Sequence, residues 1–108
     1  DRRAQALIAA NLAACGIRDA YAIIRAPAPQ AYHTIRSSPS FVPFAIILID
    51  PPYGQPAETA LEGVDKLLAP GGVVVFEHAR RSSSPGAAGR LRRTRDLVSG
   101  DSALAFYT

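Results

Sequence analysis

The chain has 108 residues, of which 48% are hydrophobic, and it carries a formal charge of +3 with a pI near 9.5. A chain of this length forms one domain, residues 1–108, and its basic balance favours a polyanionic partner. The single Cys15 excludes an internal disulfide, and no apolar run approaches the ~18 residues of a membrane span. We therefore expect a cytoplasmic protein without a membrane partner.

Three elements are predicted in the first part of the chain. Arg2–Cys15 carries apolar residues at helical spacing and is followed by Gly16, a typical residue just past a helix end. Ala20–Arg25 is an apolar run that predicts a short strand, and Gln30–Arg36 predicts at most a short helix. No set of histidine, cysteine or carboxylate side chains has metal-ligand spacing, so no metal is expected.

A buried strand is predicted at the centre of the chain. Phe44–Ile49 is a wholly apolar run rich in isoleucine, which is typical of a strand buried on both faces. Pro51 and Pro52 cannot donate to a β-ladder, so the strand must end at Asp50. Because ligands bind at the carboxyl edge of open α/β sheets, the Asp50 carboxylate is a candidate site residue.

A helix and a second strand are predicted next. Pro56–Leu68 has apolar residues at helical spacing, and Pro70–Gly72 predicts a sharp end to that helix. Val73–Phe76 is wholly apolar and is expected to lie beside the first strand, with the helix as the crossover. Glu77 then lies at the same carboxyl edge as Asp50, where it either hydrogen-bonds a substrate or braces the Asp50 loop.

The last part of the chain is predicted as a loop and a hairpin. Arg80–Gly89 has the composition of a mobile loop, and Leu91–Val98 and Ala103–Tyr107 are strands joined by a tight turn at Ser99–Ser102. The arginines that precede the next acidic residue, Asp96, are Arg80, Arg81, Arg90, Arg92, Arg93 and Arg95. They either neutralise the phosphates of a nucleic acid or lie on a solvated surface.

The tetrapeptide Asp50-Pro51-Pro52-Tyr53 has a chemical interpretation of its own. An exocyclic amine of a nucleobase is a poor nucleophile, and it improves when two acceptors hold its hydrogens and direct its lone pair. The Asp50 carboxylate and the Pro51 carbonyl are suitable acceptors, and the Tyr53 ring offers a flat face for a flipped base. The alternative is a strand end with a stiff Pro-Pro turn, in which Tyr53 is ordinary surface packing.

The tetrapeptide resembles the (D/N)-P-P-(Y/F) motif of S-adenosylmethionine-dependent methyltransferases that act on amino groups of bases. Asn11-Leu12, Val73–His78 and Gly100–Tyr107 extend the resemblance to the RsmD-type small-subunit ribosomal RNA (guanine-N2)-methyltransferases. This resemblance implies an α/β fold with the Rossmann-like sheet of class I methyltransferases. The sheet would be incomplete, without its first two strands and its Gly-rich loop, and would end in a β-hairpin.

The resemblance also implies a cofactor, a partner and roles for individual residues. Ala26, Pro27 and Ala28 correspond to the turn that binds the adenine of S-adenosyl-L-methionine, where the family usually has Asp or Asn in place of Pro27. The residues implied to contact substrate RNA are Glu77, Arg80, Arg81, Arg92 and Arg93. The expected partner is ribosomal RNA in the small ribosomal subunit, and the complete protein is expected to be a monomer.

Parts of the family's cofactor site are missing from this sequence. It has neither the Gly-rich turn that follows the family's first strand nor the acid that ends its second strand. We therefore expect the C-terminal part of one methyltransferase domain, inactive alone and binding the cofactor too weakly to detect. Two missing strands would leave a gap of roughly 14 Å between the Ala20–Arg25 and Phe44–Ile49 strands, so the first is expected to pair beside the second or to pack loosely.

Two other functions stay open at this point. An adenine-N6 DNA methyltransferase would use the same tetrapeptide, because the motif does not distinguish one base amine from another. A non-catalytic RNA-binding remnant would use only the arginine-rich hairpin.

Overall fold

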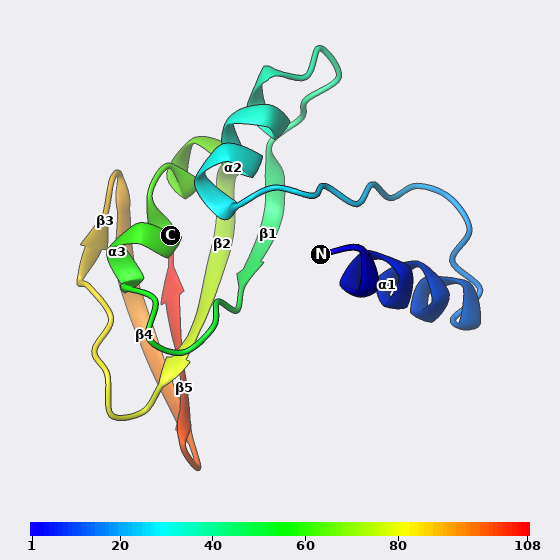
Figure 1. Cartoon of the computed structure of the whole chain (residues 1–108). Helices are drawn as coiled ribbons and strands as arrows, with labels where there is room; N and C mark the ends of the chain where they lie inside the picture. Colours follow the sequence, from blue (N-terminus) through cyan, green and yellow to red (C-terminus); the bar gives the residue numbers. More distant parts are fainter.

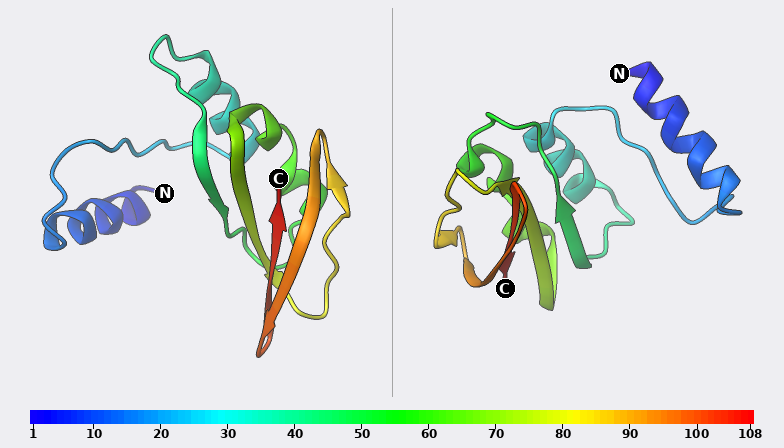
Figure 2. Two further views of the ribbon diagram at one scale, coloured as in Figure 1. Left: turned by 180° about the vertical axis from the view of Figure 1, so that it is seen from behind. Right: turned by 90° about the horizontal axis from the view of Figure 1, so that it is seen from below.

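The computed structural model describes residues 1–108 and contains one five-stranded sheet with helices over one of its faces (Figures 1 and 2). The strands are β1 (Phe44–Ile49), β2 (Leu68–Ala79), β3 (Ala87–Ala88), β4 (Leu91–Ser99) and β5 (Ser102–Tyr107), in the order β1-β2-β5-β4-β3. The helices are α1 (Arg2–Ala14), α2 (Ala28–Ser37), α3 (Ala57–Leu61) and the 3₁₀ helix η1 (Val64–Leu67). The predicted mixed α/β class is confirmed.

The strand pairing places the carboxyl ends of the two predicted parallel strands side by side. β1 runs parallel to β2, with Ile49 beside Phe76, so Asp50 leaves the sheet at the level of Glu77, which lies near the end of β2 and still pairs with β5. β5 pairs antiparallel with both β2 and β4. The predicted hairpin is therefore confirmed, and its two-residue turn has Gly100 at a positive φ of 58°, as a type II′ turn requires.

The predicted helix between the parallel strands is shorter than the apolar spacing indicated. α3 ends at Leu61, and Gly63 adopts a left-handed conformation, with φ 81°, that separates α3 from η1. β2 then begins at Leu68, so Pro70–Gly72 lies inside the strand instead of ending a helix. The prediction was wrong here because Leu67 and Leu68 fit a helical stripe and a strand equally well.

The hydrophobic core lies between α3, η1 and one face of the sheet. Val74, Phe76, Ala105 and Tyr107 alternate along β2 and β5 and are buried against the helices. The other face is more open, and on β1 the Leu48 side chain is 75% exposed. The prediction that β1 is buried on both faces was therefore wrong, since β1 is the edge strand of the sheet.

The helix α1 stands apart from the sheet, joined to α2 by an extended segment (Figure 1). It ends as predicted: Gly16 has φ 77° and donates to the Ala13 carbonyl, while Ile17 donates to the Leu12 carbonyl. No residue of α1 is buried. Packing against the sheet therefore contributes little to this helix.

The segment after α1 contains the clearest error of the sequence analysis. Ala20–Arg25 forms no strand, and it does not pair beside β1. Its apolar residues instead line a hollow with α1, in which Ile23 is half-buried and Ile24 remains 42% exposed. An apolar run becomes a strand only when a neighbouring strand accepts its backbone hydrogen bonds, and no neighbour is present here.

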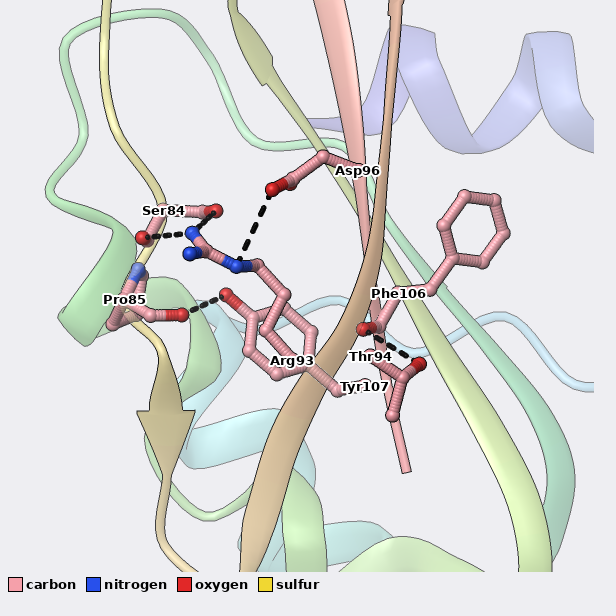
Figure 3. Close-up of polar contacts among 7 residues, drawn as sticks. All are labelled: Ser84, Pro85, Arg93, Thr94, Asp96, Phe106 and Tyr107. Carbon is pink, nitrogen blue, oxygen red and sulfur yellow. Dashed lines mark hydrogen bonds and ion pairs between the residues drawn. The ribbon is translucent and has the colours of Figure 1, made fainter.

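The loop predicted as mobile is held in its middle by contacts with the hairpin (Figure 3). Arg93 on β4 donates to the Ser84 carbonyl at 2.7 Å and to the Ser84 hydroxyl at 2.9 Å. The Tyr107 hydroxyl donates to the Pro85 carbonyl at 2.7 Å, and Asp96 pairs with Arg93 at 3.4 Å. These contacts hold the middle of the loop over the helical face.

Candidate active site

The tetrapeptide lies at the carboxyl ends of the parallel strands and borders a cavity of about 560 Å³. Pro51, Pro52 and Tyr53 line this cavity together with Glu77 from the end of β2. Asp50 is exposed and has no ion pair or side-chain hydrogen bond, so its carboxylate is free to accept one. We call this hollow the motif cavity.

The ring of Tyr53 is held by the tip of the β4–β5 hairpin. Its hydroxyl lies 3.0 Å from the Ser102 hydroxyl, although 57% of the side chain is exposed. A hydrogen bond at this distance restricts ring rotation without covering the ring face. The exposed face is therefore available for stacking.

The last four residues of β2, Phe76 to Ala79, line the motif cavity, and two of them are ionisable. Glu77 is half-buried and makes no hydrogen bond to the Asp50 loop, so no contact supports the bracing role for it. His78 is buried, stacks on Phe76 with 5.6 Å between ring centres, and has its Nδ1 2.9 Å from the Ala79 carbonyl. Its Nε2 has no partner, which is unusual for a buried polar atom.

His78 and Ser102 are site residues that the sequence analysis missed. His78 had no evident partner in the sequence, because its environment comes from the loop Ser82–Ser83 folding back over the cavity. Ser102 meets Tyr53 only because β5 pairs with β2 in a register that places Ser102 beside Ala79. No local sequence signal reports such a register.

The arginines expected to contact RNA separate into two groups. Arg80 and Arg81 are exposed at the end of β2 and lie next to Tyr53. Arg92 and Arg93 are at the start of β4, about 20 Å from the hairpin tip at ~3.3 Å per residue. Arg93 is also committed to Ser84 and Asp96, so the structure does not place this pair near the tetrapeptide.

The residues expected to bind the cofactor lie at the start of α2. Pro27 is the N-cap of α2, and the backbone N–H of Ala28 has no acceptor, so it could donate to an adenine ring nitrogen. Ala26 and Pro27 line a hollow of about 510 Å³ with α1, and this hollow shares no residue with the motif cavity. These residues fit one edge of S-adenosylmethionine, and the one carboxylate that lines the same hollow, Asp1, is engaged as the N-cap of α1.

Other kinds of site are not present. No group of three histidine, cysteine or acidic residues is placed to hold a metal ion. No helix has both the length and the apolar character needed to cross a membrane. The exposed Cys15 lies at the end of α1 and has no catalytic partner.

The fold and site together define a class of protein. A mixed α/β chain with a motif cavity at the ends of parallel strands is compatible with a fragment of a Rossmann-like methyltransferase. A family model described as conserved hypothetical protein 95 matches residues 1–108. The chain belongs to this family, an RsmD-like family of class I methyltransferases, which indicates a methyltransferase-type function.

A solved structure has the same fold over almost the whole chain. It is a conserved hypothetical protein from Streptococcus pyogenes, with a TM-score of 0.82 and 22% sequence identity. The match covers 99% of this chain and 66% of that chain, so the present chain spans about two thirds of its length. At this identity the likeness shows the fold alone. No curated protein matches the chain.

Proposed function

We propose that this chain binds the target nucleotide for methyl transfer from S-adenosylmethionine to the N2 amine of a guanine in small-subunit ribosomal RNA. The observation that carries the proposal is the motif cavity, which is lined by Pro51, Pro52 and the exposed Tyr53, the residues that directly follow the unpaired Asp50 carboxylate. The guanine and the ribosomal RNA come from the resemblance of the tetrapeptide and its flanking segments to the RsmD-type enzymes.

The chain's own residues have distinct roles in this proposal. The base stacks on Tyr53, whose ring is held by Ser102. Asp50 and the Pro51 carbonyl accept the two amine hydrogens and direct the nitrogen lone pair out of conjugation with the ring. The half-buried Glu77 offers a further acceptor at the same edge. When bound, the cofactor supplies an activated methyl group on its sulfonium, so no metal ion or covalent nucleophile is required.

Asp50→Ala tests the role of the carboxylate. We expect it to lower kcat/KM for methylation of unmodified small ribosomal subunits about 100-fold, because one acceptor of the reacting amine is lost. The measurement is transfer of labelled methyl from S-adenosylmethionine by the complete protein that contains this chain, because the chain alone is expected to be inactive. Asp19→Ala removes an exposed carboxylate outside the site and is the matched control. Full activity of Asp50→Ala would refute the proposal, and duplex DNA as the better substrate would favour the adenine-N6 alternative.

RNA binding without catalysis is the second candidate. The observation that favours it is the separation of Ala26–Ala28 from the motif cavity, together with the partial fit of these residues to the cofactor. In that case, Asp50→Ala retains RNA affinity and the complete protein transfers no methyl group from S-adenosylmethionine. Micromolar cofactor binding to the 108-residue chain would exclude this candidate.

A further inference from the structure

Tyr53 separates the motif cavity from a second cavity of about 510 Å³. The second cavity is lined by Tyr53, Ala79, Arg80, Arg81 and Asp101. Three of these residues, Tyr53, Ala79 and Arg81, line both hollows, so the two are direct neighbours. A ligand that fills both must pass along the Tyr53 ring and the Arg81 side chain.

The two cavities differ in charge. The motif cavity carries two carboxylates, Glu58 and Glu77, against the one guanidinium of Arg81. The second cavity carries two guanidinium groups against the single carboxylate of Asp101, which leaves a net positive charge. Acceptor oxygens suit the amine of a base, whereas an excess guanidinium suits one phosphodiester group.

The walls of the second cavity are held by the hairpin tip. The Arg80 N–H donates to the Asp101 carbonyl at 2.8 Å, and Ser102 holds the Tyr53 hydroxyl at 3.0 Å. The Arg80 guanidinium is partly engaged with the Gly100 carbonyl at 3.4 Å. Arg81 is exposed and has no ion pair or hydrogen bond from its side chain. Arg81 is therefore the arginine that can bind an anion without first breaking an existing contact.

We propose that the second cavity binds the phosphodiester and sugar of the nucleotide next to the target base, with Arg81 as the phosphate ligand. This inference rests on the proposed function, because it places the target base in the motif cavity. The cavity volume lies within the ~300–1,000 Å³ range of ligand sites. The chain thus recognises at least two adjoining nucleotides and not an isolated base.

Two probes of different length test the proposal by NMR titration of the ¹⁵N-labelled chain. Guanosine is a base with a sugar, and guanylyl-(3′→5′)-uridine adds one phosphodiester and a second nucleoside. The Gly54 amide reports on the motif cavity and the Asp101 amide on the second cavity. We expect the dinucleotide to bind about tenfold more tightly than guanosine, which is the contribution of one charge-assisted hydrogen bond.

Arg81→Ala isolates the phosphate contact. We expect it to remove the tenfold gain and the dinucleotide-induced shift at Asp101. Because Arg81 also lines the motif cavity, the readout is the ratio of dinucleotide affinity to guanosine affinity within each variant. Arg18→Ala removes an exposed arginine beyond the end of α1 and should change neither affinity. Arg81→Lys keeps the charge and should retain part of the gain.

The outcomes distinguish this inference from the proposed function. A dinucleotide that binds no more tightly than guanosine, or that keeps its gain in Arg81→Ala, overturns the second cavity alone. A dinucleotide that shifts Asp101 while neither probe shifts Gly54 overturns the base site and leaves the phosphate site standing. If neither probe shifts either amide, both are wrong.

Discussion

Tyr107 combines a fully buried ring with a polar group that must be satisfied. Its hydroxyl donates to the Pro85 carbonyl at 2.7 Å, which ties the end of β5 to the loop over the helical face (Figure 3). Burial raises the pKa of the Tyr107 phenol above its ordinary value of 10.0, while the hydrogen bond to Ser84 and the charge of Arg93 act in the opposite direction. The raised pKa links stability to alkaline pH.

Tyr107→Phe should destabilise the fold and weaken its response to high pH. The lost hydrogen bond leaves the Pro85 carbonyl unsatisfied, so we expect a loss of about 1–2 kcal/mol in the free energy of unfolding at pH 8. The unfolded phenol releases its proton near pH 10 and the folded one only above that. The wild-type stability is therefore fully present below pH ~10 and falls as the pH rises further. This fall should be smaller in Tyr107→Phe.

Urea unfolding at pH 8 and at pH 10.5 measures both effects. Part of the alkaline loss should remain in Tyr107→Phe, because burial also raises the pKa of Tyr32, whose hydroxyl donates to the Ala60 carbonyl. Tyr21→Phe changes an exposed ring and is the control. If the free energy of unfolding of Tyr107→Phe falls as steeply above pH 10 as that of the wild type, the Tyr107 phenol is not the cause of the fall.

The position of the candidate site could be predicted from local sequence. Which of the arginines are bound to other residues and which are free could not. Two prolines after an apolar run place Asp50 at a strand end whatever the rest of the chain does. Arg81 and Arg93 look equivalent in the sequence, yet Arg81 is free and Arg93 is bound to Ser84. Only the pairing of β4 with β5 and the path of the loop decide this difference.

At the scale of elements, the sequence analysis succeeded where the signal was local. The hairpin was correct because alternating side chains and a Gly-Asp turn specify it without any other contact. It failed where tertiary contacts decide. Ala20–Arg25 has the composition of a strand but no partner to pair with, and the left-handed Gly63 divides what would otherwise be a single helix.

The open edge of β1 should promote association between copies of the chain. Leu48 is 75% exposed and Ile46 is 64% exposed on a strand whose outer backbone groups are unpaired. We expect Leu48→Lys to reduce concentration-dependent association while changing the free energy of unfolding by less than about 0.5 kcal/mol. Sedimentation velocity at several concentrations measures the association.

Ile47→Lys is the contrasting variant for the same strand. Ile47 packs against the core from the opposite face of β1, so a lysine there buries a charge and should destabilise the fold by several kcal/mol, on the order seen for unpaired buried charges. If Leu48→Lys lowers the free energy of unfolding as much as Ile47→Lys does, the Leu48 side chain is buried and not exposed. Unchanged association in Leu48→Lys would exclude this edge as its cause.

At the scale of the whole molecule, stability is distributed unevenly. The core lies between α3, η1 and the sheet, while α1 has no buried residue and stands beside the body (Figure 2). An isolated helix of 13 residues is marginal in water, because its hydrogen bonds barely offset the entropy of ordering its backbone. Most of the free energy of folding therefore comes from residues 28–108, which include α2, whose Tyr32 packs against the core.

Native-state hydrogen exchange should reveal this division. We expect the amides of α1 to exchange through local opening at low free energy, whereas those of β2 and β5 exchange only on global unfolding. Urea should accelerate exchange in β2 and β5 strongly and hardly affect α1. Protection of α1 equal to that of the two central strands would contradict the division.

The tip of the hairpin meets Tyr53 only because β5 is aligned with β2 residue by residue. Side chains alternate between the two faces of a strand, so a one-residue slip of β5 against β2 would rotate the Ser102 hydroxyl away from the tyrosine. The Tyr53 side chain would then lose its hydrogen bond and would no longer separate the motif cavity from the second cavity. The register of a surface hairpin thus sets the geometry of the proposed nucleotide site, even though no atom of the hairpin turn has to touch the reacting amine.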